Sequence, residues 1–250
     1  MNSTEWQRQL PILENRYVDI LLGEPGSLFM TLFQAPLIGG LIALRWHDCD
    51  PGPTLNFVIC LAAVWFGCVN SCREIVKESG IYQRERLAFL SIRAYVLSKF
   101  KILVALSSLQ CAMLLLCVHY WVGIPGNKAG LMAVLIITGA AGTALGLLIS
   151  SLSSTSDKAV ATLPVLIIPQ ILFSGLTLTS GTGAWARIVR KLMIMNWSQE
   201  AFDNIQKISS ANLGTLISDF TALTLMCTLF VAATMAALKA SDPEGKDFQP

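Results

Sequence analysis

The chain has 250 residues, of which 54% are hydrophobic and 14% charged, against about 25% charged residues in an average soluble domain. Its formal net charge of +2 gives no reason to expect a nucleic-acid partner. Because charged residues are missing from long apolar stretches, the composition excludes an ordinary soluble domain and indicates an integral membrane protein.

Residues 5–22 predict an amphipathic helix at the N-terminus. Apolar side chains recur there at roughly helical spacing among polar neighbours, at Trp6, Leu10, Leu13, Tyr17, Ile20 and Leu21. That pattern is typical of a helix that lies on a membrane surface. The segment lacks the apolar core of a signal peptide, so we expect the chain to insert through its first true span.

Six apolar windows follow that are long enough for a membrane span, since a span needs about 20 apolar residues. They cover 25–45, 53–73, 97–121, 128–152, 158–179 and 216–238. Lipid offers the backbone no hydrogen-bond partner, and the windows lack the alternation of a membrane barrel, so each is expected to be a helix. The sequence thus predicts a single all-α transmembrane domain over 1–240, followed by a polar tail over 241–250.

Basic residues gather between the second and third spans. The basic side chains there are Arg73, Lys77, Arg84, Arg86, Arg93, Lys99 and Lys101, and the acidic ones are Glu74, Glu78 and Glu85. The positive-inside rule then places this segment and both termini in the cytoplasm. Arg187, Arg190 and Lys191 conflict with this orientation, because six spans put them on the outer side.

Residues 73–93 form a charged, helix-like segment that is longer than the usual connector between packed helices. One interpretation is an ordinary positive-inside loop. The other is a docking helix for a cytoplasmic partner. The acidic residues among the basic ones favour the second interpretation, because topology alone does not require them.

Spans four and five carry small residues and helix breakers. Gly139, Gly142 and Gly146 favour close packing within the chain, with a dimer contact as the alternative. Pro164 and Pro169 predict a bend in span five, which is either purely structural or part of a gate at the outer mouth.

Catalytic and nucleotide-binding motifs are missing from the sequence. There is no GxxxxGK[ST] loop, no HExxH and no GxSxG, and the seven cysteines include no CxxC pair for a metal. The span interiors are nearly free of the ionisable residues that ion-coupled transporters use. If the protein moves a substrate uphill, we therefore expect the energy to be delivered from outside the membrane.

A family resemblance rests on the stretch 66–99. This stretch contains, in order, Arg73-Glu74-Ile75-Val76 with Glu78, Ile81-Tyr82 with Arg84-Glu85-Arg86, and Tyr95 followed by Ser98-Lys99. It resembles the junction of the second and third spans in the membrane domain of type-2 ABC exporters of the G-type (White-like) subfamily. Gln34-Ala35-Pro36 in span one and Phe173-Ser174-Gly175-Leu176 in span five are similar to that family as well.

The resemblance implies roles for particular residues. A cytoplasmic coupling helix would contact an ATPase through Glu78, Ile81, Tyr82, Arg84, Glu85 and Arg86. Phe66 and Ile168 would line the substrate cavity, and the outer gate or plug would be formed by Phe173, Gly175 and Leu176. Residues 5–22 would be the connecting helix. The loop over 182–213 would hold re-entrant outer helices, although a proline often found late in that loop is absent here.

The resemblance also implies partners and a mechanism. The chain would be the permease subunit of an ATP-driven exporter that works by alternating access, as a dimer with a second copy or a related chain. ATP and Mg²⁺ would be bound by separate ABC ATPase subunits, so this chain itself would hold no cofactor and no catalytic residue. We expect a bacterial inner membrane, contact with lipid, and a hydrophobic or amphipathic substrate.

Three alternatives remain open. A solo transporter or channel would need intramembrane ionisable groups or an inverted repeat. A membrane-embedded enzyme would need a cluster of His, Asp or Glu near one face. An assembly scaffold makes no such demand. Binding to an ATPase distinguishes the exporter from all three.

Overall fold

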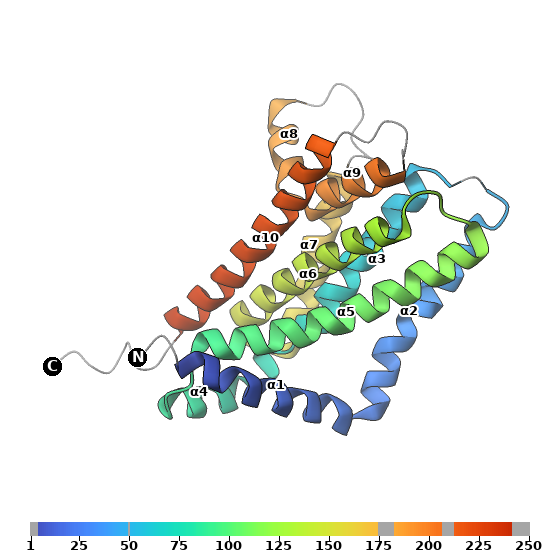
Figure 1. Cartoon of the computed structure of the whole chain (residues 1–250). Helices are drawn as coiled ribbons and strands as arrows, with labels where there is room; N and C mark the ends of the chain where they lie inside the picture. Colours follow the sequence, from blue (N-terminus) through green and yellow to red (C-terminus); the bar gives the residue numbers. More distant parts are fainter. Residues whose placement is uncertain (1–4, 50, 175–182, 207–212, 242–250) are drawn as a thin grey trace.

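The computed structural model describes residues 5–49, 51–174, 183–206 and 213–241, and the regular structure in this part of the chain is entirely helical. Long helices run side by side through the molecule, and short ones cover both ends (Figure 1). α1 (Glu5–Gly23) and α4 (Ser79–Leu87) lie at one end, here called the α1 end. α8 (Ala184–Lys191) and α9 (Ile194–Gln206) lie at the opposite end, the α9 end. The all-α fold class is thereby confirmed.

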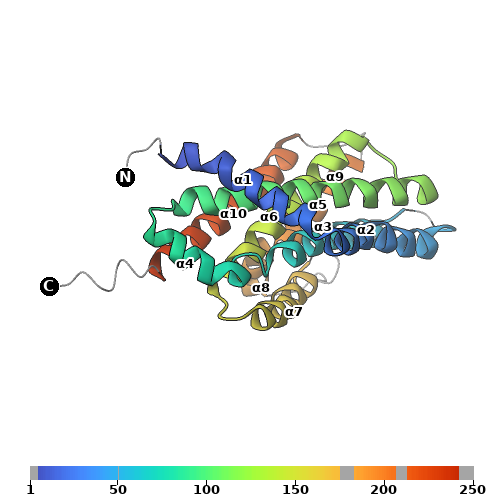
Figure 2. The same ribbon diagram turned by 90° about the horizontal axis from the view of Figure 1, so that it is seen from below.

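α1 crosses the end of the bundle and packs on α5 (Ile92–Val122), as the view from below shows (Figure 2). Leu13 and Tyr17 are the buried members of its apolar face, and its other sides are largely exposed. α2 (Pro25–Trp46) begins directly after α1, with Pro25 in its first turn. The proline ring presets a helical φ and lacks the N–H that a helix start would leave unpaired, so the chain turns sharply into the bundle there.

α3 (Pro53–Ser71) and α6 (Lys128–Leu152) form the most extensive helix interface among the described residues. Their backbones approach so closely that a Cβ atom on Gly142 would lie 2.7 Å from the carbonyl oxygen of Val64. Close packing of this kind holds helices together where lipid removes the hydrophobic driving force. The small residues of the fourth predicted span therefore serve packing within this chain.

The remaining elements complete the bundle. They are η1 (Val76–Glu78), α7 (Ser156–Leu172) and α10 (Leu213–Ala240). The Asn127 side chain accepts a hydrogen bond from the Ala129 N–H at 3.1 Å and so caps the start of α6. Gly123, in the left-handed region at φ 72°, ends α5, which is the position where glycine avoids a Cβ clash.

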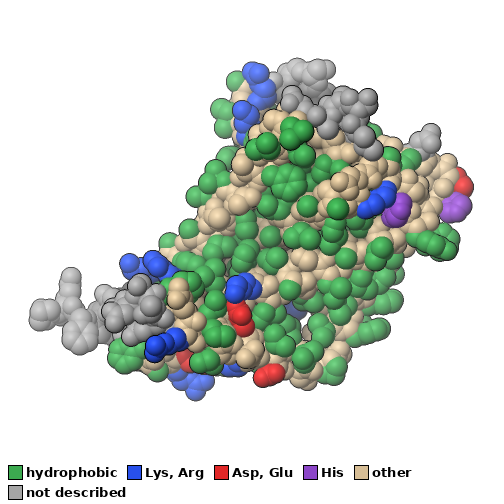
Figure 3. Space-filling model, in the orientation of Figure 1, with side chains coloured by type: hydrophobic (Ala, Val, Ile, Leu, Met, Phe, Trp, Pro, Cys, Tyr) green, Lys and Arg blue, Asp and Glu red, His purple; other side chains and the backbone are tan. Residues whose placement is uncertain are grey.

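Five helical segments in the described part are long and apolar enough to cross a membrane. They are α2, α3 with its continuation to Leu87, α5, α6 and α10. α7 has 17 residues and contains Pro164 and Pro169. The predicted span 158–179 extends past α7 into residues 175–182, which lie outside the described part. Apolar side chains cover the flank of the long helices, and charged ones gather at the two ends (Figure 3).

Candidate functional site

A buried charged cluster lies at the α1 end, where α1, η1 and α5 meet. Its centre is Lys99 of α5, which is only 2% exposed. Lys99 Nζ lies 2.8 Å from Glu78 Oε2 and 3.9 Å from Glu74 Oε2. An unpaired charge would be very costly in such a place, so the two carboxylates are what permits this lysine to be buried.

Two tyrosines enclose the same lysine. Lys99 Nζ lies 4.4 Å from the centre of the Tyr17 ring and 5.4 Å from that of Tyr95, so both rings offer their faces to the cation. The Tyr17 hydroxyl donates to Glu74 Oε2 at 2.5 Å, and the Tyr95 hydroxyl donates to Glu78 Oε2 at 3.4 Å. Burial, with the negative charge of Glu74, raises the pKa of Tyr17, so its phenol remains a donor at physiological pH.

The backbone that carries the two glutamates is anchored to α6. The Ser150 hydroxyl oxygen accepts hydrogen bonds from the N–H groups of Ile75 at 2.9 Å and Val76 at 3.0 Å. These donors belong to the N-cap and the first residue of η1, and buried backbone donors need a partner. One hydroxyl therefore fixes where Glu74 and Glu78 stand relative to the bundle core.

Polar contacts also join α1 to α4 and to the segment that follows it. Arg16 Nη1 lies 2.5 Å from Glu85 Oε1, and this hydrogen bond raises the pKa of Arg16. The Gln9 amide donates to the Phe89 carbonyl at 3.2 Å and accepts from the Ser91 N–H at 2.9 Å. α1, α4 and the start of α5 are thus tied together by contacts on both sides of the charged cluster.

The structure divides the six predicted coupling residues into two groups. Glu78 and Tyr82 are buried, Glu78 in the Lys99 cluster and Tyr82 with its ring centre 4.8 Å from that of Tyr95. Ile81 is 44% exposed, and Arg84 is exposed as well.

The other two predicted coupling residues make local contacts. Glu85 binds Arg16, and Arg86 donates to the Leu90 carbonyl at 2.7 Å. Contact of any of the six with an ATPase remains a prediction.

The two predicted cavity residues differ in burial, and their role in a cavity remains a prediction. Phe66 is completely buried inside the bundle, whereas Ile168 on α7 is half exposed. Trp65, the residue before Phe66, is the aromatic side chain that α3 exposes. Phe173 packs edge-on against Trp185 of α8, with ring centres 5.9 Å apart. The other two predicted gate residues, Gly175 and Leu176, lie outside the described residues.

Sequence reasoning missed the core of this cluster. Lys99 and Glu74 entered only as charges of the segment between two spans and as members of a family motif, and Tyr17 entered only as an apolar position on α1. A lysine at a predicted span boundary, facing two acids spaced four residues apart, was the available signal. Nothing in the sequence indicated that Tyr17, from a distant helix, would join them.

Comparison with known proteins shows the family to which the chain belongs. The family profile of the ABC-2 type transporter matches residues 9–207, so the chain belongs to this family of transporter membrane domains. It is therefore an integral, multi-pass membrane protein, and the matched residues form a permease domain of the ABC-2 type.

A particular relative agrees with this assignment. The ABC transporter ATP-binding/permease protein Rv1747 of Mycobacterium tuberculosis is 27% identical to the chain. The similarity covers 67% of this chain but 22% of the relative, so the chain corresponds to about a fifth of that protein. The predicted resemblance is confirmed for the ABC-2 family as a whole, and the G-type (White-like) subfamily remains a prediction.

Proposed function

We propose that the chain exports a hydrophobic or amphipathic substrate by alternating access, driven by separate ATPase subunits that bind ATP and Mg²⁺. Within the ABC-2 family we assign it to the G-type (White-like) exporters. The observation that carries the proposal is the Lys99 cluster, which ties η1 and α4 to both α1 and α5. A force applied to α4 would reach α5 through Glu78 and Lys99, and α1 through Glu85 and Arg16.

α4 offers the surface on which an ATPase would act. Ile81 and Leu87 of α4 are exposed, and so is Phe89, two residues after its end, at 73%. Large apolar side chains gathered on a polar, charged helix mark a site of protein contact. The basic residues around them support a cytoplasmic location for the α1 end, and with it for both termini in a bacterial inner membrane.

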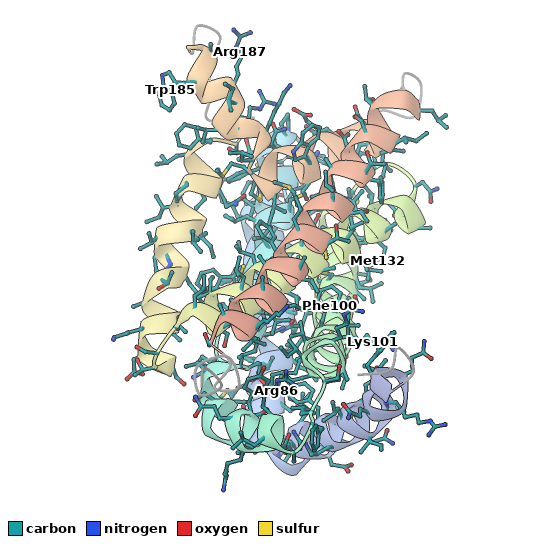
Figure 4. All side chains as sticks on the ribbon, turned by 90° about the vertical axis from the view of Figure 1, so that its left-hand side faces the viewer. Arg86, Phe100, Lys101, Met132, Trp185 and Arg187 are labelled. Carbon is teal, nitrogen blue, oxygen red and sulfur yellow. The ribbon has the colours of Figure 1, made fainter. Side chains whose placement is uncertain are left out.

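Six spans complete the proposed topology, with α7 and the residues after it as the fifth. α8 and α9 would be the re-entrant outer helices. Figure 4 shows Trp185 and Arg187 projecting from α8 at the end opposite Arg86. Arg190, one of the basic residues that conflict with this orientation, is paired with Glu200 at 2.5 Å and hydrogen-bonded to Asn196, so part of the outer positive charge is neutralised.

A second copy or a related chain would cover the open side of the bundle. α2 is buried over less than a quarter of its most apolar window, and α7 is buried only along one stripe. A substrate cavity on the dimer axis would then be lined by Ile168 from α7. Because Phe66 is buried in this state, Trp65 is the aromatic side chain that α3 would offer there.

Copurification with candidate ATPases of the host, followed by ATP hydrolysis in lipid nanodiscs, tests the proposal. Ile81→Glu places a charge on the exposed apolar side of α4, and we expect it to abolish the complex. Ile12→Glu, which charges an even more exposed apolar position on α1, is the control and should retain the complex. The Glu78→Gln variant should still bind the ATPase, but substrate should stimulate ATP hydrolysis by this complex less than it does with the wild type.

The outcomes separate the alternatives. Equal binding by the Ile81 and Ile12 variants would contradict α4 as the ATPase contact. If no host ATPase binds the wild-type chain, a solo transporter or an assembly scaffold becomes the better account. If Glu78→Gln couples as well as the wild type, the Lys99 cluster has a structural role only.

A further inference from the structure

The connection between α4 and α5 contains a residue in an unfavourable backbone conformation. Phe89 has φ 66°, and it is the one non-glycine residue with a positive φ among the described residues. The Cβ of an L-residue is crowded in this left-handed region, so the conformation costs free energy and persists only where the surroundings impose it. The connection lies beside the first half of α1, as the view from below shows (Figure 2). Contacts in and around this turn must therefore offset the cost.

Hydrogen bonds fix the backbone on both sides of Phe89. The N–H groups of Phe89 and Leu90 donate to carbonyls in the last turn of α4, at 3.2 and 3.1 Å. The side-chain amide of Gln9, on α1, bridges the turn. Its Nε2 donates to the Phe89 carbonyl at 3.2 Å, and its Oε1 accepts from the Ser91 N–H at 2.9 Å. One side chain of α1 thus holds the two peptide groups on either side of Leu90.

The Phe89 ring projects outward from this fixed turn. Leu90, the next residue, is 8% exposed and belongs to a buried apolar cluster with Leu13 and Tyr95, whereas Phe89 is 73% exposed. Glycine at position 89 would adopt the same φ without a crowded Cβ. The turn itself therefore does not explain a phenylalanine at this position, and an exposed apolar ring that the fold holds in one place indicates a contact with a partner.

The three helices that meet at this turn carry unpaired positive charge. Arg84 in α4, Arg93 in the first turn of α5 and Arg8 in α1 are all exposed. None of these three has an ion-pair partner in the described part of the chain. Glu85, the acidic residue of α4, is already paired with α1. A partner that binds here therefore gains from acidic side chains beside the site that receives the ring.

We propose that Phe89 is the anchor by which the α1 end holds an ABC ATPase, that Gln9 positions it, and that the ATPase receives the ring in an apolar pocket with an acidic rim. This inference rests on the proposed function, because it takes the ATPase as the partner. Aromatic side chains seated in pockets dominate the affinity of many protein interfaces, and a ring that is already fixed loses less entropy on binding. A fluid bilayer surface would accept a mobile side chain equally well, so the Gln9 contact favours a protein pocket.

The affinity of the full chain, in phosphatidylcholine nanodiscs, for the ATPase recovered by copurification tests the anchor. Phe89→Gly and Phe89→Ala should both weaken binding at least about ten-fold, although only the first relieves the backbone. Phe89→Leu keeps a large apolar side chain and should lose less than about three-fold. Leu22→Ala truncates a side chain that is 62% exposed at the other end of α1, and it should bind like the wild type. Thermal unfolding shows whether each variant is folded.

A double-mutant cycle tests the role of Gln9. Gln9→Ala removes the bridge but not the ring, so we expect binding to weaken about five-fold and hydrogen exchange at the Ser91 amide to become faster. Added to Phe89→Gly, it should cost no further affinity, because no ring is left to position. Gln7→Ala, at an exposed position of α1 that makes no side-chain hydrogen bond within the described residues, is the matched control. Additive losses would overturn the positioning role.

Salt dependence tests the acidic rim. Binding should weaken as the salt concentration rises, because exposed charges are screened. Arg84→Gln combined with Arg93→Gln should make this dependence weaker. Arg187→Gln, which removes an exposed charge at the α9 end, should leave it unchanged. Binding that does not respond to salt would overturn the acidic rim.

The failures of this inference and of the proposed function can be told apart. Wild-type affinity in Phe89→Gly and Phe89→Ala would overturn the anchor and leave the ATPase as the partner, whereas an ATPase that never binds the wild type would overturn both. A bimane label on Phe89→Cys, with the exposed Cys49 replaced by serine, should show a blue shift in its emission when the ATPase is added. Emission that is already blue-shifted in nanodiscs and unchanged by the ATPase would place the ring in the bilayer and overturn the protein pocket.

Discussion

The ammonium group of Lys99 lies 4.4 Å from the centre of the Tyr17 ring, so the first helix and a long central helix share one buried cation. Glu78 brings η1 and the start of α4 to the same point. Three elements far apart in the sequence thus meet on a single charge. Their relative positions are set by a group that cannot be replaced alone without leaving a buried charge unpaired.

Removing that cation should be costly. Lys99→Met leaves Glu74 and Glu78 buried with less compensation, and we expect a loss of about 3–5 kcal/mol in the free energy of unfolding. Lys101→Met, which breaks the exposed pair with Glu14, should cost less than about 1 kcal/mol. Unfolding in detergent micelles measures both. Adding Glu78→Gln to Lys99→Met should recover part of the loss, and equal effects of the two lysine variants would argue against the cluster as described.

The Ser150 hydroxyl should matter more than its size suggests. Ser150→Ala leaves the N–H groups of Ile75 and Val76 without their acceptor, which we expect to cost about 1–3 kcal/mol. Ser151→Ala removes a hydroxyl that only donates to the Leu148 carbonyl and should have a small effect. Hydrogen exchange at Ile75 and Val76 is the specific readout. Unchanged protection of these two amides in Ser150→Ala would show that the hydroxyl does not hold the turn.

The packing of α3 on α6 should not tolerate an added methyl group. Gly142→Ala would press its Cβ against the Val64 carbonyl, and we expect destabilisation of about 1–3 kcal/mol. Gly40→Ala on α2 has open space around the new Cβ and should gain up to about 1 kcal/mol from helix propensity. Thermal unfolding of the two variants compares them directly. A stabilising Gly142→Ala would mean that the two helices can separate freely.

The end of α4 contains a residue in an unfavourable backbone conformation. Phe89 has φ 66°, and its N–H and that of Leu90 bond back to Arg86 and Glu85, as in a Schellman helix end. Phe89→Gly should therefore stabilise the fold by about 1 kcal/mol. Ala88→Gly, at an ordinary φ of −94°, should give no such gain.

The same Phe89 variant separates stability from partner binding. If the exposed Phe89 ring contacts the ATPase, Phe89→Gly should weaken the complex while raising the unfolding temperature. Both effects can be measured on one preparation. A variant that is more stable and binds the ATPase unchanged would remove Phe89 from the proposed contact and leave Ile81 and Leu87.

Much of the helical layout follows from sequence, because apolar windows and helix breakers act locally. Pro25 and Gly123 are local signals that stand at a helix start and a helix end, and the glycines of α6 pack closely, as expected. Side-chain direction was harder to predict. Phe66 and Trp65 are adjacent aromatic residues, and which of them faces the core depends on the rotation of α3 against α6, which no local pattern specifies.

In residues 73–93, too, the direction of the side chains could not be predicted from the sequence. The length and acidic residues of this segment favoured a docking helix over a simple loop, but Glu78 and Tyr82 face inward because Lys99 and Tyr95 of α5 contact them. The pairing of Lys99 with Tyr17 joins residues that have α2, α3, η1 and α4 between them in the sequence. Periodicity cannot reveal such contacts, since each residue by itself fits an ordinary position at a membrane boundary.

The shared burial of Lys99 and Glu78 also restricts how this protein can diverge. A lineage that changes either residue first must pass through a form with an uncompensated buried charge. Descendant sequences are therefore expected to keep both residues or to replace both together by neutral ones. Among such descendants, substitutions at positions 78 and 99 would be correlated. This correlation would reflect their shared burial and not a contact with substrate or nucleotide.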